Sequence, residues 1–527
     1  MVVTVTKTEL ATKKENEDET RKTVTTTVIK RATGYPVHVH QFMAILATCA
    51  SLKIHVHNGG SHKIHSLDGE KESCWGTLVE KSLKHTEGSG NWWSLTLVLL
   101  PPQFLSVSSE PWIRGEALGR TKARAFPLSW LRVKMGLLGP ATQGRKTLQP
   151  TNEGKTLSPL ISDGMCKTMA ETQGYACEEH KVTTEDGYIL GLQRMPVGRF
   201  GKKADKPPVL LQHGLFMDGL TWIFNSPNES FGFILADSGY DVWLANTRGT
   251  KYSSDHKSLN PNDQVYWDWS WDELARYDLP AFVQYVYNYT GQRIHYAGHS
   301  LGTLIALAAF SQGQVLNMLR SAALLSPIAH MNQITSPPTK LAAHTFLADD
   351  VYWLGLREII PNGDAAAKFV EGICHSLHLN CLDLVIPFTG PNCCVNSSKI
   401  DVYLDHLPQP TAAKNLIHLS QMIRTGIIAR YDYGDLRQNM QHYGQPTPPM
   451  YDMAKIPNEF PLFLSYGGLD MLSDVRDVQL LLGDLKDHDG NKLVVLLKED
   501  YAHMDFVLGV NAKQMIYDPL IDFFKEN

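Results

Sequence analysis

From about Ser162 onward, short apolar runs alternate with amphipathic stretches along the chain. The apolar runs predict strands, and apolar residues at helical spacing predict helices between them. Strands alternating with helices of about ten to fifteen residues predict an α/β fold with a mostly parallel sheet and helical crossovers. The predicted strands are 209–212, 240–245, 293–297, 322–326, 461–466 and 492–497, and the predicted helices are 272–288, 301–310 and 516–524.

Two departures from this alternation divide the chain. Residues 179–195 read as a β-hairpin, because Glu185-Asp186-Gly187 forms a turn sequence between two strand-like runs. Residues 328–444 contain helical and loop patterns in no βα order, so we expect an insertion over the carboxyl edge of the sheet. We therefore predict an irregular N-terminal extension (1–155), a first part of the core that includes the hairpin (156–327), a cap insertion (328–444) and a second part of the core (445–527).

The first 155 residues show no sustained strand or helix period and differ from the rest in charge. Residues 1–160 hold 21 Lys and Arg against 13 Asp and Glu, whereas the remainder holds 28 against 41. The apolar run 92–107, broken by two prolines, is too short for a spanning helix but is similar to the apolar region of a signal peptide. No such segment is evident at Met1, so we expect the given start of the chain to be wrong or extended. The overall net charge of −5 gives no reason to expect a nucleic-acid partner.

Six of the eight cysteines lie in the acidic body, clustered in two places: Cys166 and Cys177, then Cys374, Cys381, Cys393 and Cys394. Local clustering favours short-range disulfides formed in an oxidising compartment. The pairing is not fixed by sequence, although we expect Cys166 to join Cys177. No CxxC or HxxxH spacing accompanies the cysteines, which favours disulfides over a metal site. N-x-S/T sequons at Asn228, Asn288 and Asn396 add weak support for the secretory pathway.

The strongest chemical signal is the pentapeptide Gly298-His299-Ser300-Leu301-Gly302. A G-x-S-x-G sequence between a strand and a helix places serine on a tight turn, where its hydroxyl projects free of the sheet. Glycines two residues before and after remove side chains that would clash there. Ser300 is therefore the candidate nucleophile.

A serine hydroxyl needs a histidine base, itself oriented by a carboxylate, and in this kind of fold both follow the serine in the chain. Asp470 lies on the loop after the predicted strand 461–466 and is the preferred acid, with Asp474 as its rival. The preferred base is His503, on the loop after 492–497. His488 precedes that strand in a charged turn that we expect to be solvated.

The developing charge on the substrate oxygen needs two backbone N–H donors. One is expected from Leu301, directly after the nucleophile. The other is expected from Leu215, because the predicted strand 209–212 leads into His213-Gly214-Leu215 and Gly214 lets the backbone turn there.

Five motifs together resemble the acid lipase family, which includes gastric and lysosomal lipases and their plant relatives. They fall in order over roughly residues 160–525, and residues 413–433 are also similar to the family's cap. The motifs are His213-Gly214-Leu215, Asn246-Thr247-Arg248-Gly249, Gly298–Gly302, Gly468-Leu469-Asp470 and Tyr501-Ala502-His503-Met504-Asp505-Phe506.

This resemblance implies an α/β-hydrolase core with a helical cap and lid, and hydrolysis of acylglycerols or sterol esters without a metal or cofactor. It implies Ser300, Asp470 and His503 as the triad, and Leu215 and Leu301 as oxyanion donors. Leu301 stands where animal members carry Gln, which is more similar to the plant branch. The expected partners are a neutral lipid ester and, transiently, a lipid interface. An esterase of smaller soluble esters and a non-catalytic lipid-binding homologue remain the alternatives.

Overall fold

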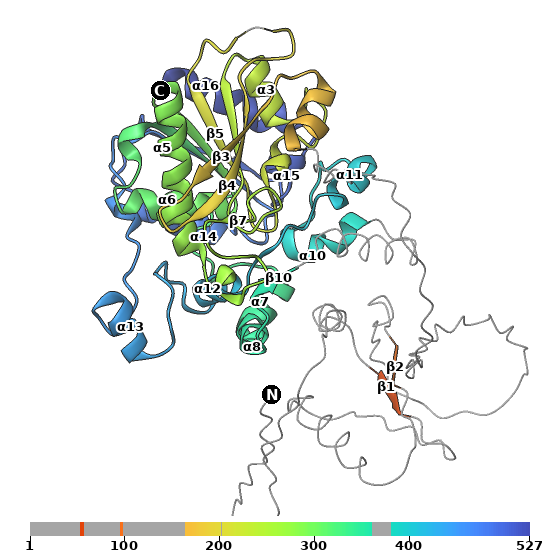
Figure 1. The fold of residues 1–527 in the computed structure, drawn as a ribbon, viewed down its shortest axis with the longest axis vertical. Coiled ribbons are helices and arrows are strands. Elements are labelled where there is room, and N and C mark those ends of the chain that lie inside the picture. Colours follow the sequence, from red (N-terminus) through yellow and green to blue (C-terminus); the bar gives the residue numbers. More distant parts are fainter. Residues whose placement is uncertain (1–52, 57–94, 99–163, 202, 361–380) are drawn as a thin grey trace, which may run out of the picture. The chain divides into compact units, whose positions relative to one another are not determined.

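The computed structural model describes residues 53–56, 95–98, 164–201, 203–360 and 381–527 (Figure 1). The N-terminal unit contributes two short strands, β1 (Lys53–Val56) and β2 (Leu95–Val98), which pair antiparallel. Strand β2 lies inside the apolar run 92–107. The other predictions for residues 1–155 lie outside the described residues.

A nine-stranded sheet forms the centre of the body, in the order β13-β12-β9-β8-β5-β6-β4-β3, with β7 also paired to β4. The six strands from β13 to β6 are parallel, and the hairpin β3–β4 and strand β7 add antiparallel partners. The predicted mostly parallel sheet is confirmed. The strands are β3 (Glu178–Thr183), β4 (Tyr188–Met195), β5 (Pro208–Gln212), β6 (Asp241–Ala245), β7 (Asp255–His256), β8 (Ile294–His299), β9 (Leu319–Leu325), β12 (Leu462–Gly467) and β13 (Leu493–Lys498).

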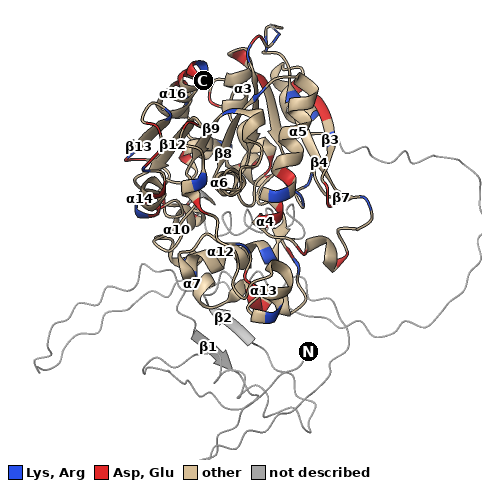
Figure 2. Cartoon of the chain, turned by 90° about the vertical axis from the view of Figure 1, so that its left-hand side faces the viewer, with Lys and Arg blue, Asp and Glu red and all other residues tan. Residues whose placement is uncertain are grey.

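Helices cover both faces of this sheet, so β5 and β8 are buried at every position rather than at alternate positions. In β5, Leu210 belongs to one core cluster while Val209 and Leu211 belong to the other. Helices α5 (Leu279–Thr290) and α6 (Leu301–Ser311) pack on the first face, and α3 (Phe231–Asp237) and α16 (Asp518–Glu526) pack on the second. Charged residues are excluded from such a position. Strand β8 accordingly contains no Lys, Arg, Asp or Glu, and it is drawn in tan in Figure 2.

The predicted helix 272–288 is in fact three segments. The first turn is α4 (Trp271–Glu273), the second is the π-helical turn Leu274–Asp278, and α5 follows. Pro280 stands in the first turn of α5, where a residue without an N–H is tolerated but interrupts the preceding α-helical hydrogen bonding. The same arrangement recurs before α16, where the π-helical turn Lys513–Tyr517 precedes Pro519.

The predicted insertion 328–444 is mainly helical where the structure describes it. Its first part meets the loop after β12, since Ser336 N–H donates to the Met471 carbonyl oxygen at 3.2 Å. Its later part meets the loop after β5, because Gln409 N–H donates to the Phe216 carbonyl oxygen at 2.8 Å. The insertion therefore covers the carboxyl ends of the parallel strands. Its elements are α7 (Pro337–His344), α8 (Leu347–Trp353), β10 (Glu358–Ile359), α10 (Ile386–Thr389), α11 (Ile400–Leu404), β11 (Thr411–Ala412), α12 (Ala413–Thr425) and α13 (Leu436–Tyr443).

Helix α12 is attached to the core through His418 and Lys414. The His418 ring stacks on Trp271 with centroids 4.1 Å apart, and its nitrogens contact Ser270 Oγ and the Ala429 carbonyl oxygen. Lys414 forms an ion pair with Asp268 at 3.2 Å. Among the described residues, no helix combines the length and apolar character needed to cross a membrane.

Candidate active site

Ser300 occupies the sharp turn between β8 and α6. Its φ of 53° lies in the left-handed region, which a residue with a side chain rarely adopts. A Cβ at Gly298 would lie 2.9 Å from the Gly302 carbonyl carbon, and one at Gly302 would lie 2.7 Å from the Gln212 carbonyl oxygen. Both glycines of the pentapeptide are thus required by close backbone approach, as predicted. Ser300 itself is 9% exposed.

Asp470 and His503 meet at the carboxyl ends of β12 and β13, adjacent parallel strands. The His503 Nδ1 atom lies 2.9 Å from Asp470 Oδ2 and 3.0 Å from Oδ1, and both residues are buried. Asp470 also accepts the N–H groups of Leu472 and Ser473. Burial raises the pKa of Asp470. The opposing effect of His503 and the two N–H donors is larger, so the pKa lies below its usual value. Asp470 is therefore held as a carboxylate.

The alternative carboxylate, Asp474, has a structural role at the start of a helix. It is the N-cap of α14 (Val475–Asp484) and accepts the N–H of Arg476 at 2.9 Å. The expectation that His488 is solvated was wrong. Its side chain is 8% exposed and its Nε2 lies 2.7 Å from the Phe460 carbonyl oxygen, because the turn before β13 folds back against the start of β12.

His299 connects the nucleophile turn to the histidine loop. Its Nε2 lies 2.9 Å from the His503 carbonyl oxygen, which only accepts, so Nε2 carries the proton. Burial lowers the pKa of His299 to about 3, so the ring is neutral. The same ring faces His503, with centroids 4.9 Å apart. His299 thus fixes the backbone of His503 relative to its neighbour Ser300.

The loop after β5 lies directly against the nucleophile. A Cβ at Gly214 would lie 3.0 Å from Ser300 Cβ, so a side chain at this position would crowd the nucleophile. His213 Nδ1 lies 2.8 Å from the Gly214 carbonyl oxygen, and its Nε2 accepts the N–H of Thr247 at 3.1 Å. Leu215 and Leu301 both line a small cavity at this place.

The role of His213 follows from the geometry of the peptide bond. Because Nε2 accepts from Thr247, the proton of the neutral ring must be on Nδ1, which donates to the Gly214 carbonyl. The C=O and N–H of one trans peptide point in opposite directions. Holding the Gly214 carbonyl on His213 therefore turns the N–H of Leu215 away from His213. Burial lowers the pKa of His213 to about 4, which preserves this neutral form at neutral pH.

The Asn246-Thr247-Arg248-Gly249 motif holds this loop in place. Asn246 Oδ1 accepts the N–H of Gly219 at 2.9 Å, and Thr247 contacts His213 as described. Arg248 is 1% exposed and forms ion pairs of 2.6 Å with both Asp278 and Asp186. A buried guanidinium paired on both sides fixes the turn between β3 and β4 against α5. Sequence reasoning assigned these residues no role, because their contacts join segments distant in the chain.

The cysteines of the body are oxidised wherever the structure describes them. Cys166 and Cys177 form the predicted disulfide. Cys381 is also disulfide-bonded, and the adjacent residues Cys393 and Cys394 are joined to each other. Cys374 lies outside the described residues.

Comparisons with known proteins agree with this architecture. Residues 166–226 match the family model of a partial alpha/beta-hydrolase lipase region, and residues 207–370 match that of the alpha/beta hydrolase fold. The chain is 48% identical over 388 residues to triacylglycerol lipase 2 of Arabidopsis thaliana, which covers 73% of this chain and 91% of that protein. It is 44% identical over 369 residues to triacylglycerol lipase 1 of the same plant, covering 70% and 91%.

A mammalian relative is more distant. The chain is 36% identical over 363 residues to the lysosomal acid lipase/cholesteryl ester hydrolase of Macaca fascicularis, covering 67% of this chain and 88% of that protein. The greater identity with the two plant lipases agrees with the similarity to the plant branch that Leu301 indicated.

Proposed function

The chain belongs to the acid lipase family of α/β-hydrolases, and from that premise we propose that it hydrolyses neutral lipid esters through Ser300, Asp470 and His503. The observation that carries this proposal is the arrangement at the sheet's carboxyl edge. A serine on a strained turn lies against Gly214, and an Asp470–His503 pair is tied to the same turn by His299. It is a lipase and carboxylic ester hydrolase, like the relatives it matches.

In the first half of the proposed reaction, the Ser300 hydroxyl attacks the ester carbonyl carbon and His503 takes its proton. Asp470 is held ionised, so it favours the His503 tautomer with the proton on Nδ1 and stabilises the imidazolium that forms. The N–H groups of Leu215 and Leu301 stabilise the oxygen that gains negative charge. The tetrahedral intermediate collapses, His503 gives its proton to the departing alcohol, and an acyl-Ser300 ester remains.

In the second half, a water molecule attacks the acyl-Ser300 carbonyl carbon while His503 takes a proton from it. The same two N–H groups stabilise the second tetrahedral intermediate. Its collapse releases the fatty acid and returns the proton to the Ser300 oxygen. No cofactor or metal takes part in these steps, because the nucleophile, base, acid partner and oxyanion donors are all protein groups.

We favour neutral lipids over small soluble esters because of the insertion over the site. Residues 328–444 act, in this proposal, as a cap that covers a long acyl chain, and Ser300 is only 9% exposed beneath it. The names of the relatives include triacylglycerol and cholesteryl esters as substrates. Assays of the purified enzyme on triacylglycerols, cholesteryl esters and p-nitrophenyl esters of graded chain length test the choice. A preference for the shortest esters would favour the soluble-ester alternative.

Replacing the nucleophile tests the chemistry itself. Ser300→Ala should remove ester hydrolysis while leaving the fold intact, since only a hydroxyl is lost. A serine-directed phosphonate should label Ser300 in the wild type and leave Ser300→Ala unlabelled, as read by peptide mass mapping. Substantial residual activity, or labelling of another serine, would contradict the assignment.

We also propose that the chain enters the secretory pathway, as a secreted or lysosomal or vacuolar enzyme. Its oxidised cysteines suit an oxidising compartment, and the relative from Macaca fascicularis is named for the lysosome. Asn228 and Asn288 of the sequons are exposed, as glycan attachment requires. Glycosidase treatment of protein purified from its native source, followed by a mass shift, tests this placement.

A further inference from the structure

The segment 389–395 of the insertion lies against the loop that carries His503. The Thr389 carbonyl oxygen accepts the N–H of His503 at 3.2 Å, and Asn392 Oδ1 accepts the N–H of Met504 at 2.9 Å. The contact continues beyond this point, because the Cys394 carbonyl oxygen accepts the N–H of Val510 at 2.9 Å. The position of the His503 loop thus depends on this segment.

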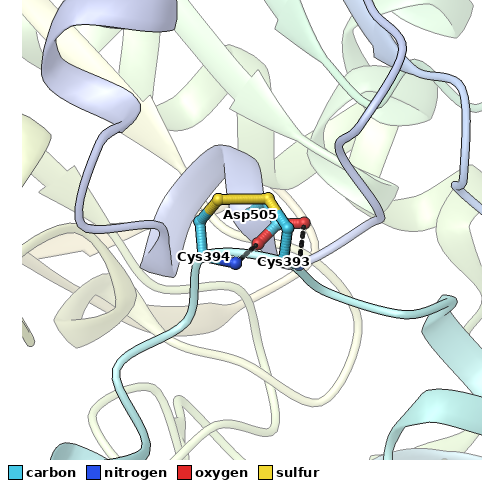
Figure 3. Close-up of side chains that lie close together, drawn as sticks. All are labelled: Cys393, Cys394 and Asp505. Carbon is cyan, nitrogen blue, oxygen red and sulfur yellow. Dashed lines mark hydrogen bonds between the residues drawn. A yellow bond between two sulfur atoms is a disulfide. The ribbon is translucent and has the colours of Figure 1, made fainter.

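A buried carboxylate joins the two segments. Asp505 is fully buried, and its two oxygens accept the N–H groups of Cys393 at 3.1 Å and Cys394 at 2.9 Å (Figure 3). It also accepts the N–H of Ala502, directly before His503, at 2.8 Å. Hydrogen bonds to a buried charge are stronger than neutral ones, and leaving such a charge without donors is costly. The turn at Cys393–Cys394 and the His503 loop are therefore coupled through Asp505.

We propose that the Cys393–Cys394 disulfide is a reversible redox modification site that sets the turnover of the enzyme through the position of His503. The proposal rests on the proposed function, in which His503 is the base. Cys393 is exposed, so a reductant reaches this disulfide directly, whereas Cys166 of the other described pair is buried. Exposed disulfides are the ones that exchange readily with external thiols.

The reductant is a dithiol, either a small molecule or a protein. Its thiolate attacks one sulfur of the pair, and a mixed disulfide forms while the other cysteine leaves as a thiolate. The second thiol of the reductant then displaces the first cysteine, and the reductant departs as a cyclic or internal disulfide. Two electrons pass to the cysteines, which take up two protons to give two thiols. Reoxidation reverses each step.

The disulfide restricts the backbone torsions of two adjacent residues, which keeps their N–H groups directed at Asp505. Reduction removes that covalent restriction, and holding both N–H groups in place then costs conformational entropy. When the turn loosens, Asp505 loses its fixed position, and Ala502 and the adjacent His503 are displaced with it. Because small displacements of a catalytic group cost rate steeply, we expect turnover to fall about tenfold. Substrate affinity should change little, since neither cysteine belongs to the proposed catalytic set.

The experiment titrates the folded enzyme with dithiothreitol and follows two readouts in the same samples. Alkylation and peptide mass mapping report which cysteines are reduced, and kcat and KM are measured on a short soluble ester. We expect Cys393 and Cys394 to be the first cysteines alkylated, kcat to fall about tenfold in step with them, KM to stay within about twofold, and oxidation to restore kcat. The variant C393S/C394S should have low kcat and no response to dithiothreitol, whereas the matched control C166S/C177S should respond as the wild type does.

The possible contrary results separate the two proposals. Non-reduced mapping that finds Cys393 and Cys394 unlinked, or their reduction with unchanged kcat, overturns the redox proposal. If the oxidised enzyme labels with a serine-directed phosphonate at Ser300 in that case, the proposed function survives. Absence of labelling at Ser300 in the oxidised enzyme instead overturns the proposed function. If C393S/C394S does not fold, the titration of the wild type still decides, because it begins from folded protein.

Discussion

The Nε2 atom of His213 accepts the backbone N–H of Thr247 at a distance of 3.1 Å, and its Nδ1 atom donates to the carbonyl oxygen of Gly214, the next residue. The His213 side chain thus joins the loops after β5 and β6, and its contact with Thr247 places the ring proton on Nδ1. The orientation of the Gly214–Leu215 peptide follows from that choice. A residue outside the proposed triad therefore orients one of the two proposed oxyanion donors.

Replacing His213 tests this dependence. His213→Ala leaves the Gly214 carbonyl without its donor, so the Leu215 N–H is no longer fixed, and kcat should fall about ten- to a hundredfold with little change in KM. His213→Asn retains an N–H donor near the position of Nδ1 and should recover part of kcat. Steady-state kinetics on one ester compares the three proteins. Equal kcat values for the wild type and His213→Ala would contradict the role of His213.

The two aspartates after β12 offer a matched comparison. Asp470→Asn replaces an acceptor with a group that also donates, which disfavours the His503 tautomer needed for catalysis, so kcat should fall by about four orders of magnitude. Asp474→Asn keeps a good N-cap for α14 and should leave both kcat and thermal stability close to those of the wild type. Both variants are assayed at one pH on the same ester. A larger loss in Asp474→Asn would move the acid to that residue.

The buried ring of His418 should make stability depend on pH. Burial lowers its pKa to about 3, whereas the unfolded chain takes up the proton near about pH 6.5. The unfolded state thus binds more protons between these values, and this residue makes the free energy of unfolding fall as pH falls through that window. Urea unfolding at several pH values should give a shallower decline in His418→Gln, by up to about 1.4 kcal/mol per pH unit. Parallel declines in the two proteins would show that His418 does not contribute.

The N-terminal extension should be dispensable for hydrolysis. All nine strands of the main sheet, and every residue proposed for catalysis, follow residue 156. A truncated chain beginning at Thr156 should keep kcat within about twofold and its melting temperature within a few degrees, about what a 1 kcal/mol change produces. Loss of soluble protein, or a larger loss of activity, would show that residues 1–155 support the core.

The strands could be located from the sequence because parallel strands buried on both faces are rich in apolar residues, as Val209, Leu210 and Leu211 of β5 are. Asp470 and His503 could be chosen as the proposed acid and base because each follows a strand, in the chain order expected for this fold. The helix boundaries at 272–288 were less accurate, since a π-helical turn and a proline divide a stretch whose apolar spacing is helical throughout.

Three features could not be predicted from the sequence, because each depends on a contact between segments that are distant in the chain. The burial of His488 arises from its acceptor on Phe460, and nothing in the charged turn around it indicates that contact. The tautomer of His213 is set by Thr247, and the pairing of Cys393 with its neighbour depends on a turn that Asp505 stabilises from over a hundred residues away. In each case the deciding partner lies on a different strand or loop.

The proposed cap lies between β9 and β12 in the chain, and these two strands are hydrogen-bonded neighbours, with Ala322 beside Leu462. The core therefore closes on itself however long the intervening chain is. Doubling the length of a flexible connection costs only about 0.6 kcal/mol of closure entropy. A lineage is thus free to lengthen, shorten or resequence this module, and so to change what reaches Ser300, while the spacing of the strands that carry the proposed nucleophile, acid and base stays the same.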